Sequence, residues 1–294
     1  MIISSHIFYI MITGIFAISI FSISDNDFLL TSTVFAAETI PDDKGVIMVK
    51  YPSHQHSVYN PLILAGEGLN YYTNYNNTGD IKSKEYFINT ANWLVTNAKH
   101  NEGGYSLWAN EFTWPWYNEL TPPYYSAYTQ AMGIDVLARA YALTNNQTYL
   151  DEANKAFLAL LVNYDYGGVT TIEDNNGDLL FFHELAKPGF QKTYILNGQT
   201  GALLHIWEYY KITHNPAAKL VFDKGINYLK QNLWKYDTGT WSRYDLKPIG
   251  QTDNLASMDY QKIHIDHLKK LYDITGEPIL KEYSDKFNKY CNCV

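Results

Sequence analysis

The sequence predicts a mainly α-helical protein, an (α/α) toroid of about four antiparallel helix pairs with a small β-hairpin in a long loop. Short turns containing Thr73, Thr144, Thr213 and Thr275 recur roughly 60 to 70 residues apart, and each precedes a helical pattern. Connections are short within a pair and long between pairs. This repeat fits an open solenoid or a closed toroid, and the long connections favour the toroid. No linker divides the chain, so one toroid domain is expected over residues 59–294.

Eight segments carry the helical spacing of apolar residues, two for each pair. In the last of them, Leu280, Tyr283 and Phe287 fall on one helix face. Pro216 and Pro278 stand at expected helix starts, where proline is tolerated. The first helices of the pairs are expected over residues 62–72, 126–143, 198–212 and 259–274, and the second helices over residues 83–98, 148–162, 216–234 and 278–290.

The long connections between pairs span residues 99–124, 163–196 and 235–258. Each leads from a second helix to the next first helix, so the three gather at one end of the array, where a cleft would be built. The middle connection predicts a hairpin with strands over residues 169–173 and 179–183 around Asp174-Asn175-Asn176-Gly177. Residues 38–58 form a short N-terminal extension in which only a strand over residues 46–51 is expected.

Residues 1–37 are expected to be a signal peptide or a membrane anchor. No charged side chain precedes Asp25, and residues 7–24 are mostly apolar and nearly long enough to span a bilayer. Val34-Phe35-Ala36-Ala37 has the small-residue pattern of a signal-peptidase site. Either interpretation places the rest of the chain outside the cytosol, secreted or anchored to the membrane through residues 7–24.

Composition and charge exclude several classes of protein. A hydrophobic share of 46% with 18% charged residues supplies a core and excludes a disordered chain. A net charge of −8 without a basic run argues against nucleic acid as a partner. The 26 tyrosines suit sugar surfaces and also fill cores, so their number alone decides nothing.

The cysteine and histidine patterns predict neither a disulfide nor a metal site. A single residue separates Cys291 from Cys293, which disfavours a disulfide within the pair; an ordinary tail is expected ahead of a metal pair or a lipid-modified tail. His54-Gln55-His56 and the pair His264 and His267 lack the partners of common zinc motifs. We therefore expect no metal.

The long connections hold the candidate chemistry, with an ordinary interpretation beside each functional one. Aromatic residues in Trp114-Pro115-Trp116-Tyr117 could stack on sugar rings or pack under their own loop. Glu184 follows an apolar strand, so it is either a desolvated carboxyl with a raised pKa or a surface glutamate. Tyr244 lies between Arg243 and Lys247, which could lower its pKa for acid–base work, although spacing alone favours an ordinary tyrosine.

Several stretches, in order, resemble a known family over roughly residues 59–290. They are Tyr59-Asn60-Pro61, Tyr125-Ser126-Ala127, Leu196-Asn197-Gly198, Tyr236-Asp237-Thr238-Gly239, Asn254-Leu255-Ala256 and Asp259-Tyr260. Together they resemble the C-terminal domain of D-glucuronyl C5-epimerases, the enzymes of heparin and heparan sulfate maturation. The resemblance implies a helical toroid, in agreement with the repeat pattern.

The resemblance also implies a reaction that needs no cofactor. The family removes the C5 proton of a hexuronate in a polymer and returns a proton to the opposite face, so that D-glucuronate becomes L-iduronate. This proton lies α to a carboxylate and is very weakly acidic, so the site must stabilise an enolate-like state. Two acid–base groups, one on each face of the ring, are required.

The residues that match family motifs form the implied site. Glu184, Tyr244 and Tyr260 are the implied acid–base candidates. The implied substrate-binding residues are Asn197, Lys247, Asn254, Tyr125, Arg243 and His264. Lys247 stands where the family usually has arginine, which keeps the charge but loses the bidentate fork.

At three positions the sequence departs from the family pattern. Leu185 and Gly201 stand where the family has tyrosines, and Ser257 stands where it has an arginine. These departures leave open a heparan sulfate-like polysaccharide, a different uronate polymer, or a loss of activity.

Three hypotheses for function follow, all with a uronate-containing polysaccharide or another glycan as partner. The first is a polysaccharide uronate C5-epimerase. The second is a polysaccharide lyase or glycoside hydrolase on the same toroid, since the loops hold several carboxylates that could serve as a pair. The third is a non-catalytic glycan-binding protein of the cell envelope. A homodimer is an open alternative to a monomer.

Overall fold

The computed structural model describes residues 38–52, 54–114, 119–246 and 254–293, and confirms the predicted mainly α-helical fold. The predicted signal or anchor segment of residues 1–37 and Lys247 lie outside the described residues. Eight α-helices are found within the described ranges. They are α1 (Pro61–Thr78), α2 (Ile81–Asn97), α3 (Ala127–Thr144), α4 (Gln147–Leu158), α5 (Leu196–Thr213), α6 (Pro216–Asn232), α7 (Met258–Thr275) and α8 (Pro278–Cys291).

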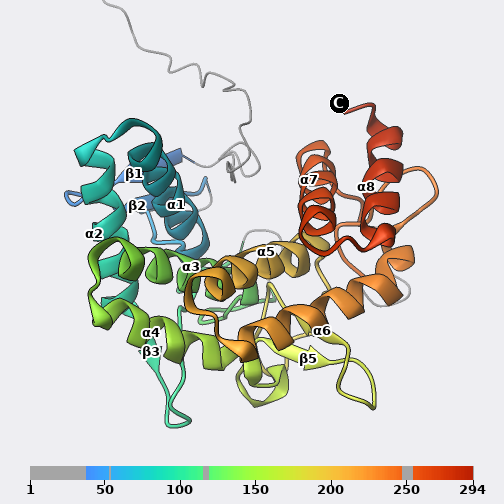
Figure 1. Cartoon of the computed structure of the whole chain (residues 1–294), viewed down its shortest axis with the longest axis horizontal. Helices are drawn as coiled ribbons and strands as arrows, with labels where there is room; N and C mark the ends of the chain where they lie inside the picture. The colour runs from blue at the N-terminus through green and yellow to red at the C-terminus, as the bar shows by residue number, and fades with distance from the viewer. Residues whose placement is uncertain (1–37, 53, 115–118, 247–253, 294) are drawn as a thin grey trace, which may run out of the picture.

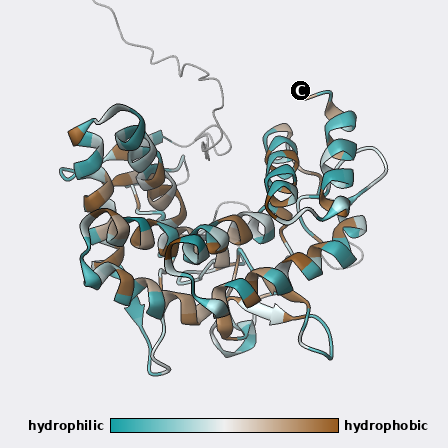
Figure 2. Ribbon diagram, viewed as in Figure 1, coloured by the Kyte–Doolittle hydropathy of each residue, from teal (hydrophilic) through white to brown (hydrophobic). Residues whose placement is uncertain are grey.

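Consecutive helices pair, and the four pairs follow one another along an arc from α1 and α2 to α7 and α8 (Figure 1). The odd-numbered helices form the inner row, in which α3 packs on α1 and α5, and α5 packs on α7. The even-numbered helices lie outside them and meet one another far less. In Figure 2 the hydrophobic segments lie mostly where helices face each other. No helix among the described residues is long and apolar enough to cross a membrane.

The predicted repeat is visible in the turn inside each pair. The last residue of each inner helix is a threonine whose Oγ1 donates to the carbonyl four residues back and accepts the N–H two residues on; these are Thr78, Thr144, Thr213 and Thr275. The next residue takes the left-handed conformation that ends a helix. The prediction was wrong for the first pair, because α1 continues through Thr73 and ends before Gly79.

Three short hairpins accompany the helices in the part of the chain that the structure describes. The predicted hairpin is confirmed as β5 (Thr170–Ile172) and β6 (Leu180–Phe182), which pair antiparallel. The predicted N-terminal strand is β2 (Ile47–Lys50), and its partner β1 (Glu38–Pro41) was missed. A third hairpin joins β3 (Lys99–His100) to β4 (Ser106–Leu107). Strand β2 pairs with β1 and packs on α1, so this hairpin lies against the helical body.

Buried glutamines near the start of three inner helices fix the long connections. Each side-chain oxygen accepts a backbone N–H from the connection, and each side-chain nitrogen donates to a carbonyl of the outer helix in the same pair. The three are Gln130, which binds Trp108 and Ala156, Gln199, which binds Phe182 and Gly225, and Gln261, which binds Ser242 and Phe287. These hydrogen bonds therefore fix the long connections against the N-terminal ends of the inner helices.

The chain end corrects one prediction. Cys291 and Cys293 form a disulfide, with their Cα atoms 5.1 Å apart. Helix α8 ends at Cys291, and Asn292 takes a left-handed conformation that turns the chain back, so one intervening residue suffices. The expectation of an unpaired tail was wrong because this reversal is not apparent from spacing.

Candidate functional site

The candidate site lies where the long connections meet the first turns of the inner helices. Gln199 accepts the N–H of Phe182 at 2.7 Å, and Gln261 accepts the N–H of Ser242 at 3.2 Å. Each bond lies two residues before a predicted acid–base residue, Glu184 in one connection and Tyr244 in the other. The glutamine contacts thus hold both segments against α5 and α7.

Glu184 is buried, as its place after an apolar strand predicts. It is 7% exposed, and its Oε2 accepts a hydrogen bond from Nδ2 of Asn197 at 3.1 Å. Burial raises the pKa of Glu184 to about 7, against a smaller lowering by the Asn197 hydrogen bond. A Cβ at position 198 would lie 2.7 Å from Oε2, so Gly198 is what allows the carboxylate to approach α5. A carboxyl titrating near neutrality can both give and take a proton.

Tyr244 and Tyr260 form a tilted aromatic pair beside this carboxyl. Their ring centroids are 4.6 Å apart. Burial raises the pKa of Tyr260 well above its usual value, the Glu184 charge raises it further, and a hydrogen bond with Tyr244 lowers it. Ser257 caps α7 by accepting the N–H of Tyr260, so the departure at this position has a structural role. The Tyr260 side chain is therefore a protonated phenol at neutral pH.

Three further tyrosines of this region were missed by the motif comparison: Tyr51, Tyr124 and Tyr128. All three are buried, and Glu184 raises the pKa of Tyr124 and of Tyr128, after the larger effect of burial. The Tyr124 hydroxyl has no hydrogen-bond partner among the described residues. Their sequence positions, after β2, in the first connection and in α3, give no signal that a motif search could find.

Other predicted residues take varied positions. The backbone carbonyl of Asn254 accepts the backbone N–H of Tyr244 at 2.7 Å, and its Nδ2 donates to Oδ2 of Asp245 at 2.9 Å.

Tyr125 is half-buried and pairs through its backbone with Ala186, two residues after Glu184. Arg243 is also half-buried, and its backbone N–H donates to the carbonyl of Tyr236. These contacts place all three residues in or beside the connections that carry Glu184 and Tyr244.

His264 lies in the core rather than at the site surface. It is fully buried, its Nδ1 is 2.9 Å from Oγ of Ser242, and burial lowers its pKa to about 3. The prediction that it contacts substrate finds no support in this position. Leu185 is likewise buried, in an apolar cluster that also contains Tyr51 and Tyr124.

Three aromatic residues of the first connection lie inside the protein. Tyr105, Trp108 and Trp114 are all buried, so packing under their own loop is the interpretation that fits them. Residues 115–118 lie outside the described part of the chain. Within that part, no three histidine, cysteine or acidic side chains cluster as metal ligands.

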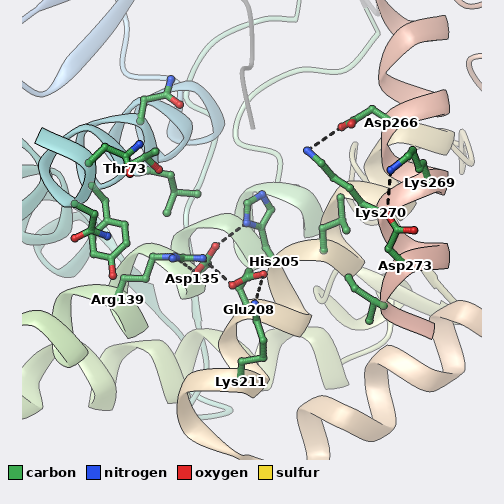
Figure 3. Close-up of a pocket in the computed structure, with 17 residues that line it drawn as sticks. Thr73, Asp135, Arg139, His205, Glu208, Lys211, Asp266, Lys269, Lys270 and Asp273 are labelled. Atoms are coloured by element: carbon green, nitrogen blue, oxygen red, sulfur yellow. Dashed lines mark hydrogen bonds and ion pairs between the residues drawn. The ribbon is translucent and has the colours of Figure 1, made fainter. Parts of the chain in front are cut away.

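A second polar region opens at the other end of the inner row. A pocket of about 730 Å³ lies between the C-terminal halves of α1, α3, α5 and α7 (Figure 3). On its floor, Asp135 contacts Arg139 at 2.7 Å and Nδ1 of His205 at 2.8 Å, and Arg139 reaches Glu208 at 2.9 Å. None of the residues predicted from motifs lines this pocket, so it is distinct from the Glu184 site.

Comparisons with known proteins identify the family. The model of the D-glucuronyl C5-epimerase C-terminus matches residues 99–289. The chain belongs to this family. A D-glucuronyl C5-epimerase of Caenorhabditis elegans is 29% identical over 218 residues, which are 69% of this chain and 34% of that protein. An uncharacterized protein of Methanocaldococcus jannaschii is 30% identical over 206 residues, 70% of this chain and 64% of the relative. The chain thus spans about one third to two thirds of these relatives.

Solved structures share the fold of this C5-epimerase family member at low identity. A family 105 glycoside hydrolase of C. acetobutylicum has a TM-score of 0.56 at 14% identity, covering 79% of this chain and 64% of that one. A D-mannose isomerase has a TM-score of 0.54 at 10% identity, covering 78% and 57%. At these identities the likeness concerns the helical toroid fold alone.

Proposed function

We propose that this protein is a polysaccharide uronate C5-epimerase that converts D-glucuronate into L-iduronate-type residues without a cofactor. The observation that carries the proposal is the buried Glu184 carboxyl, whose pKa is about 7, beside the Tyr244 and Tyr260 pair in a chain of this family. A proton donor and a proton acceptor that coexist near neutral pH are what the reaction needs.

The chemistry assigns different tasks to these groups. As a carboxylate, Glu184 takes the C5 proton from one face of the uronate ring. Tyr260, which remains protonated at neutral pH, gives a proton to the other face, and Tyr244 stabilises the Tyr260 phenolate through their hydrogen bond. Donors around the uronate carboxylate must stabilise the enolate-like state that develops between these steps.

The proposed substrate contacts follow the family motifs. Asn197, Asn254, Tyr125 and Arg243 lie in or next to the segments that hold Glu184 and Tyr244. Lys247, outside the described residues, stays a prediction for pairing with the uronate carboxylate. The secreted or extracytoplasmic location, the anchor through residues 7–24 and a homodimer likewise stay predictions.

Hydrogen exchange at C5 tests the proposal. The protein is incubated with glucuronate polymers, sulfated and desulfated, in D₂O, and the chains are examined by NMR and mass spectrometry. We expect deuterium at C5 and new L-iduronate-type signals without chain cleavage. Unsaturated chain ends that absorb in the ultraviolet would indicate a lyase instead, new reducing ends a hydrolase, and binding without exchange a non-catalytic glycan-binding protein.

A further inference from the structure

The pocket at the C-terminal end of the inner row is a second polar site of the molecule. Its volume is about 730 Å³, and its walls come from all four inner helices (Figure 3). Pockets that bind small organic ligands span about 300 to 1,000 Å³, so this volume suits a ligand of roughly one to two sugar rings. The groups proposed for C5 chemistry lie at the other end of these helices, so the proposed reaction leaves the pocket without a task.

The charges that line the pocket compensate one another. The described residues of the lining include four acidic and four basic side chains: Asp135, Glu208, Asp266 and Asp273, and Arg139, Lys211, Lys269 and Lys270. Each basic side chain has an acidic partner within the lining, at distances of 2.7 to 3.1 Å. The lining therefore offers many hydrogen-bond donors and acceptors with little net charge.

This pairing favours an uncharged ligand over a uronate. A carboxylate that approached Lys270 would also meet Asp266, whose Oδ2 lies 3.0 Å from the lysine nitrogen, so repulsion would offset much of the attraction. An uncharged ligand meets no such opposition, because it can bind without breaking the ion pairs. The expected ligand of the pocket thus differs from that of the Glu184 site, whose proposed substrate is an anion.

Hydroxyl groups match the donors and acceptors on the floor of the pocket. Nε of Arg139 binds Asp135 and one terminal nitrogen binds Glu208, which leaves further N–H groups of the guanidinium for a ligand. A hydroxyl can accept from a guanidinium and donate to a carboxylate at the same time. Leu204 and Ile274 also line the pocket and offer apolar contact to the C–H groups of a sugar ring.

The α1 wall adds side chains that the fold itself does not engage. Asn76 and Asn77 are exposed in the last turn of α1, and their amides make no hydrogen bond to another described residue. Asn74, by contrast, lies outside the lining and donates to Oγ of Ser83 on α2 at 2.7 Å. An amide carries both donors and an acceptor, so the two amides of the lining can bond the hydroxyls of a ligand.

We propose that this pocket is a binding site for an uncharged sugar unit of about one to two rings, separate from the Glu184 site. Sugar hydroxyls bond the network of Asp135, Arg139 and Glu208 on the floor and the amides of α1 on the wall. No covalent bond forms or breaks there. The inference goes beyond the proposed epimerase function and does not depend on it.

Binding of neutral disaccharides tests the site without any assay of catalysis. Cellobiose, maltose and N,N′-diacetylchitobiose are each titrated to about 10 mM against the folded protein and followed by saturation-transfer NMR, with a glucuronate-containing disaccharide alongside. We expect a neutral disaccharide to bind with a dissociation constant that changes less than about twofold between low and high salt. The proposal is wrong if none of the neutral disaccharides binds, or if the glucuronate-containing one binds this pocket more tightly.

Substitutions in the α1 wall locate the bound sugar. The double variant Asn76→Ala with Asn77→Ala should weaken binding at least about 10-fold. Its thermal unfolding should stay close to wild type, because both side chains are exposed and alanine favours a helix. Gln231→Ala, which removes an exposed amide of the outer helix α6 outside the lining, is the matched control and should keep the wild-type affinity.

Glu184→Gln separates the two sites and should also keep the wild-type affinity for the neutral sugar. Unchanged affinity in the double variant, or a loss in Glu184→Gln, would place the sugar outside this pocket and overturn the proposal. Absence of C5 exchange in the wild-type protein would refute the proposed epimerase function and leave the binding result to decide the pocket.

Discussion

The pKa of the Glu184 carboxyl lies well above its ordinary value. Its ordinary pKa of 4.5 rises to about 7 because burial disfavours the charged form. The folded protein therefore holds this proton more tightly than the unfolded chain does. Its contribution to stability is complete below pH 4.5 and is lost as the pH rises through 7.

Glu184→Gln should remove that pH dependence. The shift corresponds to about 3 kcal/mol of unfolding free energy that the wild-type protein loses between pH 4.5 and pH 8. Glutamine keeps the shape and cannot ionise, so the variant should gain on the wild-type protein by roughly this amount over the same range. Urea unfolding of both proteins at pH 4.5 and pH 8 measures the difference. An equal loss of stability in both would contradict the burial of a titrating Glu184.

At single residues, motifs predict Glu184 and Tyr260 as acid–base candidates, and that role stays a prediction, whereas contacts between distant segments have no motif. Glu184 and Tyr260 follow recognisable segments, and the structure brings both into one region. Tyr128 and His205 come from different helices, and only folding places their ring centroids 6.0 Å apart. His264 shares the motif region but faces the core, because helix direction decides which side chains reach the site.

At the scale of helices and strands, the buried glutamines explain how long connections are held still. Gln199 makes three hydrogen bonds, to the N–H of Phe182 and to the carbonyls of Leu180 and Gly225. The same geometry recurs at Gln130 and, with a different set of partners, at Gln261. The connection ahead of each of these inner helices is thus locked to its own helix pair.

Gln199→Leu should destabilise the fold and displace Glu184. Three buried backbone groups would lose their partners, at about 1 to 3 kcal/mol for each unsatisfied group, with partial relief by relaxation. We expect a loss of about 2 to 4 kcal/mol in thermal or urea unfolding, together with slower C5 exchange. Gln147→Leu is the control, because Gln147 bonds only Asp151 at an exposed site. Equal stability of the two variants would contradict the anchoring role.

Periodicity predicted the helices well and the small strands unevenly. The hairpin of β5 and β6 was visible because a turn sequence separates two apolar runs. Strand β1 was missed because its pairing with β2 gives no periodic signal in four residues. The first turn was predicted at Thr73 because Tyr72-Thr73-Asn74 resembles the other threonine turns, but α1 continues to Thr78 and ends before Gly79.

At the scale of the whole molecule, one arc of inner helices supports two polar regions. The N-terminal ends hold Glu184 and the tyrosines, and the C-terminal halves hold the pocket with its ion pairs. Asp135 links α3 to α5 through His205, and Arg139 extends the link to Glu208 (Figure 3). The interior ion pairs therefore join neighbouring helix pairs.

Asp135→Asn should weaken that link strongly. Asp135 is 1% exposed, and removing its charge leaves Arg139 without its buried partner. Breaking such a buried pair costs about 3 to 5 kcal/mol. The exposed pair of Lys281 and Asp285 provides the control, since Asp285→Asn should cost under about 1 kcal/mol. Urea unfolding of both variants measures the contrast, and similar small losses would show that the interior pair does not hold the arc together.

The most direct test of the account compares C5 hydrogen exchange in the wild-type protein and in Glu184→Gln. Each protein is incubated in D₂O with the glucuronate polymer that the wild-type protein labels, and circular dichroism confirms that both are folded. We predict that the variant loses at least about 100-fold in exchange rate, whereas Glu102→Gln, at an exposed turn far along the chain, keeps the wild-type rate. Exchange at the wild-type rate in folded Glu184→Gln would contradict the central claim that this buried carboxyl moves the C5 proton.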